Sequence, residues 1–357
     1  MTIPLRAFNP ALRDDEQAPL TLHPAGPAGN PVIAMLLNAH SMDLLGGPHA
    51  LIDDQGRMRQ VRYTPGTPDR ALVTTPAGEA VAYAFCSGEA PFVVTEVGGV
   101  VHPAYRRRGI GTALLRWAER QARAILAAAP ADAHLVLNAH CYDVDQGARA
   151  LLGQEGYHRA REWIHLTVIL DEPPPAPVFP PGITVRELDQ RSDWPQVGPA
   201  LDEAFMDHWG QIGMAADPAP SPDPPADGQP STATAIEDDP YFNSAGLCFV
   251  ALHGDEVVGS CLCNARTIEW PDVGRVGSLS IRRPYRRQGI ARALLHHAFG
   301  AFYQRGVRRI VTDTDGASFT GANHLYAQVG MSIYRRELTF ERTLRPGREW
   351  RALHAVA

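Results

Sequence analysis

The sequence predicts an α+β protein with two similar domains in tandem, each built on a mainly antiparallel sheet flanked by helices. The first observation is a strand-like run that breaks at a proline, passes several arginines and a glycine, and continues as a helix. It occurs twice, as GVVHPAYRRRGIGTALL and as SLSIRRPYRRQGIARALL. The second observation is a repeated offset, since Arg286 lies 180 residues after Arg106, and Gly289 lies 180 residues after Gly109. Near the ends of the halves the offset is 174, where ALLGQEGY at 150–157 matches HLYAQVGM at 324–331. We therefore expect an internal duplication.

The third observation is the segment DEPPPAPVFPPG at residues 171–182. Its prolines lack amide donors and favour extended geometry, which is typical of a semi-rigid linker. Directly after it, ITVREL at 183–188 matches IPLRAF at 3–8. We expect an N-terminal domain over residues 1–170, the linker, and a C-terminal domain over 183–345.

Each half is predicted to repeat one order of elements. A first strand leads into a helical region, which is DWPQVGPALDEAFMDHWG in the second half. A hairpin follows at residues 72–86 and again at 247–263, where two β-rich runs surround a glycine-containing turn. A strand then ends at the arginine turn and a helix begins, with apolar residues at helical spacing: Leu114, Leu115 and Ala118, or Leu294, Leu295 and Ala298. A further strand, a short helix and a last strand close each half.

One segment falls outside the repeat. DPAPSPDPPADGQP, at residues 217–230, has no apolar residue larger than alanine or proline, so it cannot contribute to a core. We expect a loop over about residues 215–238 that is either disordered or a lid.

Composition excludes several classes of protein. The 357 residues carry a formal charge of −6 and no basic tail, which argues against a nucleic-acid or membrane partner. The N-terminal residues lack the pattern of a signal peptide, and no run approaches about 18 apolar residues, so a cytoplasmic protein is expected. The cysteines form no CxxC pair with histidine partners, so neither a disulfide framework nor a metal site is predicted. They are Cys86, Cys141, Cys248, Cys261 and Cys263.

The duplicated turn has the chemistry of a diphosphate site. It lies between a strand and a helix N-terminus, where the first-turn amides lack acceptors and the helix dipole adds positive charge. A glycine permits close approach of a phosphate to the backbone, and an arginine three residues earlier adds charge. The alternative is a solvated basic helix start, but two copies in matching places favour an anion site. The pattern comprises Arg106, Gly109 and Gly111, and then Arg286, Gly289 and Ala291.

The strand, the turn and the later HLYAQVGM segment resemble motifs A and B of the GCN5-related N-acetyltransferases (GNAT). The resemblance covers nearly the whole chain twice, as in a tandem member with a layout similar to that of the mycothiol synthases. It implies two GNAT-like domains with splayed sheets, acetyl-CoA as acyl donor, and a small-molecule amine as acceptor. It also implies a monomer that forms an internal pseudo-dimer, or a weak homodimer.

By residue match, the resemblance places acetyl-CoA against the strand before each turn and on the turn itself. The first-half residues are Val100, Val101, Arg106, Arg107, Arg108, Gly109, Ile110, Gly111 and Thr112. The second-half residues are Leu279, Ser280, Ile281, Arg286, Arg287, Gln288, Gly289, Ile290, Ala291, Arg292 and Asn323.

The resemblance also suggests which half is catalytic. The tyrosine of its LYxxxGM segment protonates the departing thiolate, and Tyr326 fills that place in the second half. Leu152 fills it in the first half, which we therefore expect to be a degenerate copy that either binds CoA or supports its twin. The alternative for Tyr326 is a packing role in the core.

Candidates for the remaining roles are less specific. Glu269 and Asp272 lie before the strand that would flank the thioester and are candidate general bases, with turn solvation as the alternative. Asp207, His208 and Trp209 lie on the segment that borders the acceptor site in the resembling family, where an aromatic ring and charges suit a cationic amine. Trp209 could equally anchor the core.

We therefore expect acetyl transfer to a primary amine by direct attack, with no metal and no covalent enzyme intermediate. A catalytically silent acyl-CoA-binding module, sensing or regulatory, is the alternative from another class. The acceptor is open among antibiotics, polyamines, amino acids, peptide N-termini and an amino-sugar thiol precursor like that of the mycothiol synthases.

Overall fold

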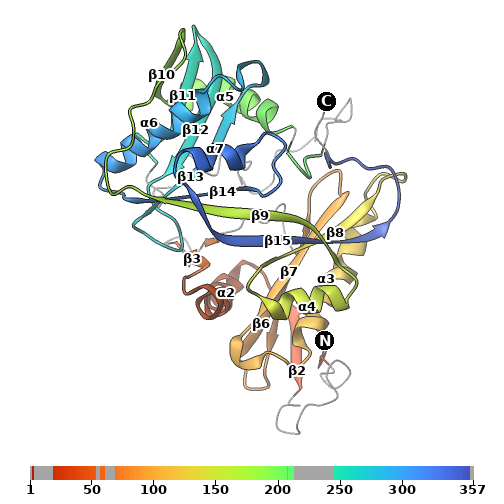
Figure 1. The fold of residues 1–357 in the computed structure, drawn as a ribbon. Helices are drawn as coiled ribbons and strands as arrows, with labels where there is room; N and C mark the ends of the chain where they lie inside the picture. The colour runs from red at the N-terminus through yellow and green to blue at the C-terminus, as the bar shows by residue number, and fades with distance from the viewer. Residues whose placement is uncertain are drawn as a thin grey trace. The chain divides into compact units, whose positions relative to one another are not determined.

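The computed structural model describes residues 2–3, 19–53, 57–60, 69–206, 208–212 and 244–353 (Figure 1). The loop expected at about 215–238 and the candidate Asp207 lie outside these residues. The chain forms two compact units. The first unit comprises Met1–Arg161 and Glu337–Trp350, and the second comprises Glu162–Arg336 and Arg351–Ala357.

The first unit contains a mixed sheet in which β7 and β8 are parallel, and the other neighbouring strands that the structure describes in it are antiparallel. Its strands, in spatial order, are β1 (Thr2–Ile3), β2 (Leu20–Pro24), β5 (Asp69–Thr74), β6 (Ala80–Gly88), β7 (Val94–Val101), β8 (Leu135–Tyr142) and the later part of β15 (Ser332–Arg345). A separate hairpin is formed by β3 (Ala50–Ile52) and β4 (Met58–Gln60).

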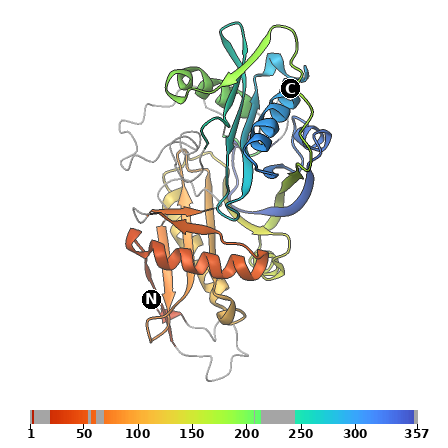
Figure 2. The same ribbon diagram turned by 90° about the vertical axis from the view of Figure 1, so that its left-hand side faces the viewer.

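Helices cover both faces of this sheet, because β6 is apolar on both sides. Tyr83 packs with Ile33 of α2 (Asn30–Leu45), whereas Ala82 and Ala84 pack with Ile110 of α3 (Ile110–Leu126). Figure 2 shows α2, in orange-red, lying across the strands of the first unit. The remaining helices are α4 (Gln146–Gln154) and the short turns η2 (Pro27–Gly29) and η3 (Pro103–Tyr105).

The second unit repeats this architecture, again with one parallel pair, β13 and β14, among its antiparallel neighbours. Its strands, in spatial order, are β9 (His158–Ile169), β14 (Arg309–Asp315), β13 (Val273–Ile281), β12 (Glu256–Asn264), β11 (Phe249–His253) and β10 (Ile183–Glu187). Its helices are α5 (Gln190–Phe205), η5 (Arg283–Tyr285), α6 (Ile290–Gln304) and α7 (Ala322–Gln328).

The core of the second unit lies mainly between the sheet and α6. Phe299 and Phe302 are completely buried there, and burial of such a ring contributes about 2–3 kcal/mol. Gly274 of β13 allows the Phe302 ring to approach, since a Cβ at Gly274 would lie 2.5 Å from it. On the other face, Val197 of α5 packs with Leu262 of β12.

The compact units and the sequence repeat divide the chain differently. The closing strand of the first half, β9, pairs with β14 of the second unit, where Ile169 lies opposite Arg309. The closing strand of the second half, β15, pairs with β8 of the first unit, where Thr339 lies opposite His140. The domains expected at 1–170 and 183–345 keep each closing strand in its own half, whereas the structure exchanges them, because strand pairing depends on long-range hydrogen bonds.

The predicted order of elements is otherwise present in both units, including the α+β class and the mainly antiparallel sheet. Among the described helices, none combines the length and the apolar character needed to cross a membrane.

Candidate active site

The two arginine turns have nearly identical backbone geometry. Gly289 is the N-cap of α6 with φ 87°, and Gly109 is the N-cap of α3 with φ 80°. Two residues earlier, Arg287 and Arg107 also have positive φ, 64° and 65°. Left-handed residues that alternate with others turn successive amide N–H groups toward one concavity, which binds anions. Each turn therefore forms an anion cradle.

Nothing in the second turn competes with an anion for this cradle. Gly289 has no side chain to cap the first-turn amides of α6, and the first turn contains no acidic residue. A Cβ at Gly289 would meet no atom of the described residues within 4 Å, so the positive φ is what favours glycine there. These residues fit the pyrophosphate of a coenzyme.

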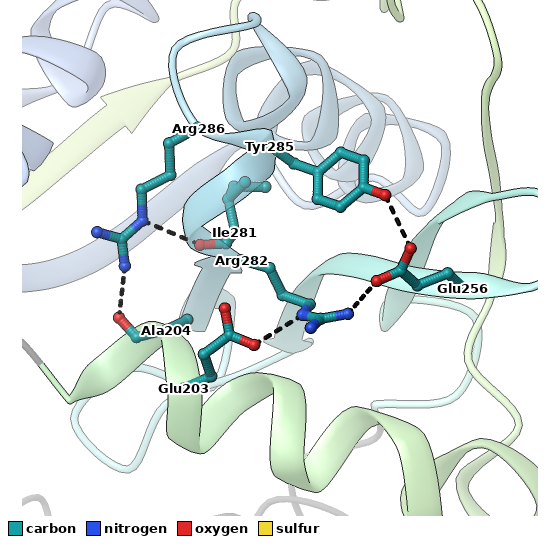
Figure 3. Close-up of polar contacts among 7 residues, drawn as sticks. All are labelled: Glu203, Ala204, Glu256, Ile281, Arg282, Tyr285 and Arg286. Carbon is teal, nitrogen blue, oxygen red and sulfur yellow. Dashed lines mark hydrogen bonds and ion pairs between the residues drawn. The ribbon is translucent and has the colours of Figure 1, made fainter.

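The leading arginine of the second turn acts as an anchor in the described structure (Figure 3). Arg286 donates from Nε to the Ile281 carbonyl at 3.1 Å and from a terminal nitrogen to the Ala204 carbonyl at 3.0 Å. These bonds tie the turn to the end of β13 and to α5. The predicted contact of Arg286 with cofactor stays a prediction.

A second set of contacts in Figure 3 holds the same turn against β12. Arg282 donates to Glu203 of α5 at 2.8 Å and also pairs with Glu256 of β12. The Tyr285 hydroxyl donates to Glu256 at 2.8 Å, and this hydrogen bond raises the pKa of Tyr285 above its ordinary value. The side chains of the two ion pairs are 29–47% exposed, so each pair adds little to stability but restricts the turn.

The first turn is anchored in the same way to α2. Arg106 donates to Asp43 at 2.6 Å and to His40 Nδ1 at 3.1 Å. Burial lowers the pKa of His40, which favours the neutral imidazole that can accept from Arg106. The Tyr105 hydroxyl donates to Glu79 at 2.7 Å, as Tyr285 does to Glu256.

In the second unit the sheet opens beside the turn. The parallel pairing of β13 with β14 covers only three residue pairs and ends with Arg275 opposite Val311. The Thr312 hydroxyl donates to the Val276 carbonyl at 2.9 Å and closes the apex of the opening. The register of β13 against β12 shifts here, which places Gly277 in a bulge. Beyond the apex, β13 presents a backbone edge suited to an extended ligand.

Tyr326 of α7 reaches this apex. Its side chain is buried and hydrogen-bonded to that of Thr312, and burial raises the pKa of the phenol well above its ordinary value. The phenol therefore stays protonated and can act as a proton donor. Leu152 lies at the matching place on α4 of the first unit and is also buried.

The other predicted site residues lie as follows. The Glu269 side chain is 8% exposed, and its carboxylate forms an ion pair with the Arg335 guanidinium at 2.5 Å. Asp272 is exposed before β13. The His208 ring lies 4.4 Å from that of Phe205. Trp209 is half-buried. Their catalytic and acceptor roles stay predictions.

The structure also places the strand residues and the asparagine that were predicted to contact the cofactor. Val100 and Val101 lie on β7, and Leu279, Ser280 and Ile281 lie on β13. The Ser280 hydroxyl is 2.8 Å from that of Ser260. Asn323 donates from Nδ2 to the Gly316 carbonyl at 2.6 Å and fixes the loop before α7. Its contact with cofactor stays a prediction.

Sequence reasoning missed the polar residues at the openings. Thr312 holds Tyr326, and two ionisable pairs lie at equivalent places, Arg275–Asp313 in the second unit and Glu96–His140 in the first. A signal was present, because polar side chains interrupt otherwise apolar strands in LVLNAHCY and RIVTDTD. Their partners lie about forty residues away, which a local pattern does not reveal.

The cysteines are poorly suited to nucleophilic catalysis. All five are buried, and burial raises the pKa of Cys86 and of Cys141 to about 12. A thiol of this kind supplies little thiolate near neutral pH. In the part of the chain that the structure describes, no cluster of three or more histidine, cysteine or acidic side chains could hold a metal ion.

Comparison with known proteins matches both halves of the chain to one family. The model of the acetyltransferase (GNAT) family matches residues 49–152 and 214–331, one match for each turn. Mycothiol acetyltransferase of Salinispora arenicola is 28% identical over 286 residues, covering 78% of this chain and 83% of that protein.

Two solved structures span nearly the whole chain. A GCN5-related N-acetyltransferase from Sphaerobacter thermophilus has a TM-score of 0.67 and 30% identity, covering 95% of this chain and 99% of its own. A tandem GNAT protein from the clavulanic acid biosynthesis pathway has a TM-score of 0.61 at 18% identity, covering 92% and 100%. The tandem layout and the splayed, mainly antiparallel fold predicted from the sequence are confirmed.

Proposed function

This chain belongs to the acetyltransferase (GNAT) family and is an acetyltransferase, and from that premise we propose that its second unit transfers the acetyl group of acetyl-CoA to a primary amine of a small molecule. One observation carries the choice of unit. The second unit combines an open anion cradle at Gly289 with a buried phenol, Tyr326, at the apex of the neighbouring opening. The first unit has Leu152 in place of that phenol.

The chain's own residues would bind the donor through backbone groups. The amides of residues 287–291 form the cradle for its pyrophosphate, and the β13 edge at 279–281 offers donors and acceptors to its pantetheine arm. Acetyl-CoA supplies an acyl group joined to sulfur as a thioester. Arg286 contributes by holding the turn against α5.

In this proposal Tyr326 is the general acid. Its phenol keeps its proton because burial raises its pKa, and it donates that proton when negative charge develops at the leaving sulfur. Thr312 is a positioning residue, since its hydroxyl is hydrogen-bonded both to Tyr326 and to the Val276 carbonyl. The phenol is thereby oriented before the reaction begins.

The proposal also assigns candidates for the general base and for the site that binds the amine acceptor. Glu269 and Asp272 remain the candidate bases, acting directly or through water, and the segment with Asp207, His208 and Trp209 is the proposed acceptor site. Similarity to mycothiol acetyltransferase supports an amino-sugar thiol precursor as one acceptor to test beside polyamines and amino acids.

The alternative is a silent acyl-CoA-binding module, and one assay separates the two. We expect a panel of amines to release free CoA thiol from acetyl-CoA, with the acetylated product confirmed by mass spectrometry. Calorimetry should show acetyl-CoA binding at micromolar affinity or better, on the order of −8 kcal/mol. Binding without turnover across the panel would favour the silent module, and a folded protein that binds no acetyl-CoA would contradict both functions.

A further inference from the structure

The first unit contains an ionisable cluster that the proposed function does not use. Glu96 Oε2 of β7 lies 2.8 Å from His140 Nε2 of β8. On the other side of the imidazole, Nδ1 lies 3.1 Å from the Thr339 hydroxyl and 3.6 Å from a carboxylate oxygen of Glu337, both on β15. The three ionisable side chains are 12–18% exposed. We call Glu96, His140 and Glu337 the β7/β8 cluster.

The β7/β8 cluster lies at the mouth of the first unit's opening. Parallel pairing of β7 with β8 ends at Glu96 opposite Asn138, and His140 is two residues further along β8. The cluster lies on the α2 face, because Ser87, which pairs with Glu96, alternates along β6 with Phe85 and Tyr83, which pack against α2. Glu96 is carried by β7, the strand that leads into the turn with the anion cradle at Gly109.

An independent observation indicates a missing hydrogen-bond donor. Asn138 is 7% exposed, and its Oδ1 is buried without a hydrogen-bond partner among the described residues. Its Nδ2 faces Glu96 Oε1 at 3.4 Å, so the amide belongs to the same polar site. A buried acceptor without a donor is costly, and a ligand N–H would satisfy it.

The side chains of the cluster favour a ligand that donates hydrogen bonds. Two carboxylates flank one imidazole, and carboxylate oxygens accept hydrogen bonds from an ammonium group. The equivalent residues of the second unit are Arg275, at its last parallel pair, and Asp313, two residues along β14. They form a closed neutral pair at 2.5 Å. The first unit thus places two carboxylates and the buried Asn138 acceptor at its opening, where the second unit has one arginine–aspartate pair.

We propose that the first unit is a second acetyl-transfer centre, specific for a cationic primary amine such as an aliphatic polyamine. Glu96 and the Asn138 carbonyl bind the ammonium group, and His140 is a positioning residue that shares the proton taken up by Glu96. The donor is the same acyl thioester as in the proposed function, on which this inference rests for the identity of that donor. The family match over residues 49–152 and the cradle at Gly109 support binding of the donor to this unit.

The chemical step balances without a further reactant. The ammonium group first loses one proton to the Glu96–His140 pair, from which it passes to water. The neutral amine attacks the thioester carbonyl carbon, so that a C–N bond forms and the C–S bond breaks. The second proton lost by nitrogen goes to the departing thiolate, which leaves as a thiol. Leu152, which lies where the second unit has Tyr326, cannot donate a proton. The proton therefore reaches the sulfur without help from a side chain at that place.

The rival explanation is that the cluster only fixes β15 in the first unit, through His140 and Thr339. Glu119 of α3 provides a matched control. It is a buried carboxylate of the same unit that also holds β15, through Arg342 at 2.8 Å, and it accepts from the Tyr157 hydroxyl at 3.1 Å. A purely structural role predicts the same consequences for Glu96→Gln and Glu119→Gln.

The experiment uses the full chain with spermidine as probe. Calorimetry should show that Glu96→Gln weakens spermidine binding roughly tenfold or more, the usual effect of losing a hydrogen bond to a charged group, whereas Glu119→Gln changes it less than twofold. In a Tyr326→Phe background, which suppresses the second unit, spermidine acetylation should fall at least tenfold on adding Glu96→Gln but not on adding Glu119→Gln. Two acetyl-CoA molecules should bind per chain.

Equal effects of Glu96→Gln and Glu119→Gln on spermidine binding, or no binding by the parent protein, would overturn the inference. So would a stoichiometry of one acetyl-CoA that Gly289→Glu abolishes. Failure of the proposed function gives a different result, namely Tyr326→Phe without effect on acetylation of any amine in the panel.

Discussion

The two units share their turns and differ at their openings. Gly109 and Gly289 have φ values of 80° and 87°, and both turns are anchored through the leading arginine to the helix beside them. The ionisable pairs at the openings are instead Glu96–His140 and Arg275–Asp313. An anion cradle made of backbone groups needs only the dihedral angles, so its side chains can vary, whereas chemistry at the opening depends on each side chain.

The apex of the opening differs as well. In the second unit Thr312 follows the last parallel pair, holds Tyr326, and lies beside the bulge at Gly277. In the first unit Ala139 follows the last pair, Leu152 replaces the tyrosine, and the register of β6 with β7 runs without a shift. The difference separates a centre with a built-in proton donor from one without it.

The largest effect is expected at the cradle of the second unit. Gly289→Glu places a carboxylate in front of the first-turn amides and should reduce acetylation of a second-unit acceptor to background. Gly109→Glu should leave that reaction largely intact. Because any side chain is strained at positive φ, Gly306→Glu is the matched control, with φ 80° and no atom within 4 Å of its Cβ. Equal loss in the Gly109 and Gly289 variants, with circular dichroism unchanged, would contradict the assignment to the second unit.

The second largest effect is expected when the phenol of Tyr326 is removed. Tyr326→Phe keeps the ring in the core and removes the proton donor, so the rate of acetyl transfer by the second unit should fall about 10²- to 10⁴-fold. Affinity for acetyl-CoA should stay nearly constant in calorimetry, because the loss falls in the transition state.

Tyr303→Phe, the same change at a residue that stacks on Arg308, is the control and should leave the rate unaltered. Turnover of Tyr326→Phe within about threefold of the parent would show that Tyr326 only packs in the core, since the expected loss begins near 10².

A smaller effect on kcat is expected when Tyr326 is kept but its contact with the Thr312 hydroxyl is removed. Thr312→Val removes the hydroxyl that contacts Tyr326 and the Val276 carbonyl while nearly preserving volume. We expect kcat to fall roughly tenfold with little change in acetyl-CoA affinity, because positioning rather than chemistry is lost. An unchanged kcat would argue that the orientation of Tyr326 does not depend on Thr312.

The arginines that anchor the two turns are expected to contribute differently to the free energy of unfolding. Arg286→Ala removes two bonds to carbonyls and should lower the free energy of unfolding by about 1–2 kcal/mol. Arg106→Ala removes a partly exposed pair with Asp43 and should cost about 0–1 kcal/mol. Urea titration of both variants measures the difference, and a larger loss for Arg106→Ala would contradict the ranking.

The smallest expected effect is a change in the stability of the second unit at low pH. Hydrogen bonds from Arg186 hold the pKa of Asp193, in the first turn of α5, below its ordinary value, whereas α2 has no acidic residue in its first turn. A depressed pKa contributes stability that is present above about pH 4 and is lost as pH falls through the folded-state pKa. Asp193→Asn should therefore remove a small acid-dependent decrease in the stability of the second unit. An identical pH profile in thermal unfolding of variant and parent would refute this contribution.

Features that consecutive residues encode could be predicted from the amino-acid sequence. The duplicated turn, the helices that follow it and the hairpins were all predicted, because glycine with positive φ, proline and helical spacing act within a few residues. The tandem fold followed from the 180-residue offset between Arg106 and Arg286. Tyr326 was singled out by its place in a local motif.

Local sequence patterns did not reveal which strands close each unit or which side chains meet at the openings. The exchange of β9 and β15 depends on hydrogen bonds such as those between β15 and β8, whose residues lie about two hundred positions apart. In the β7/β8 cluster, His140 contacts Glu96, 44 positions away, and it also contacts Thr339, 199 positions away. Contacts at such separations arise from the register and curvature of a whole sheet, which no local pattern of apolar and polar residues specifies.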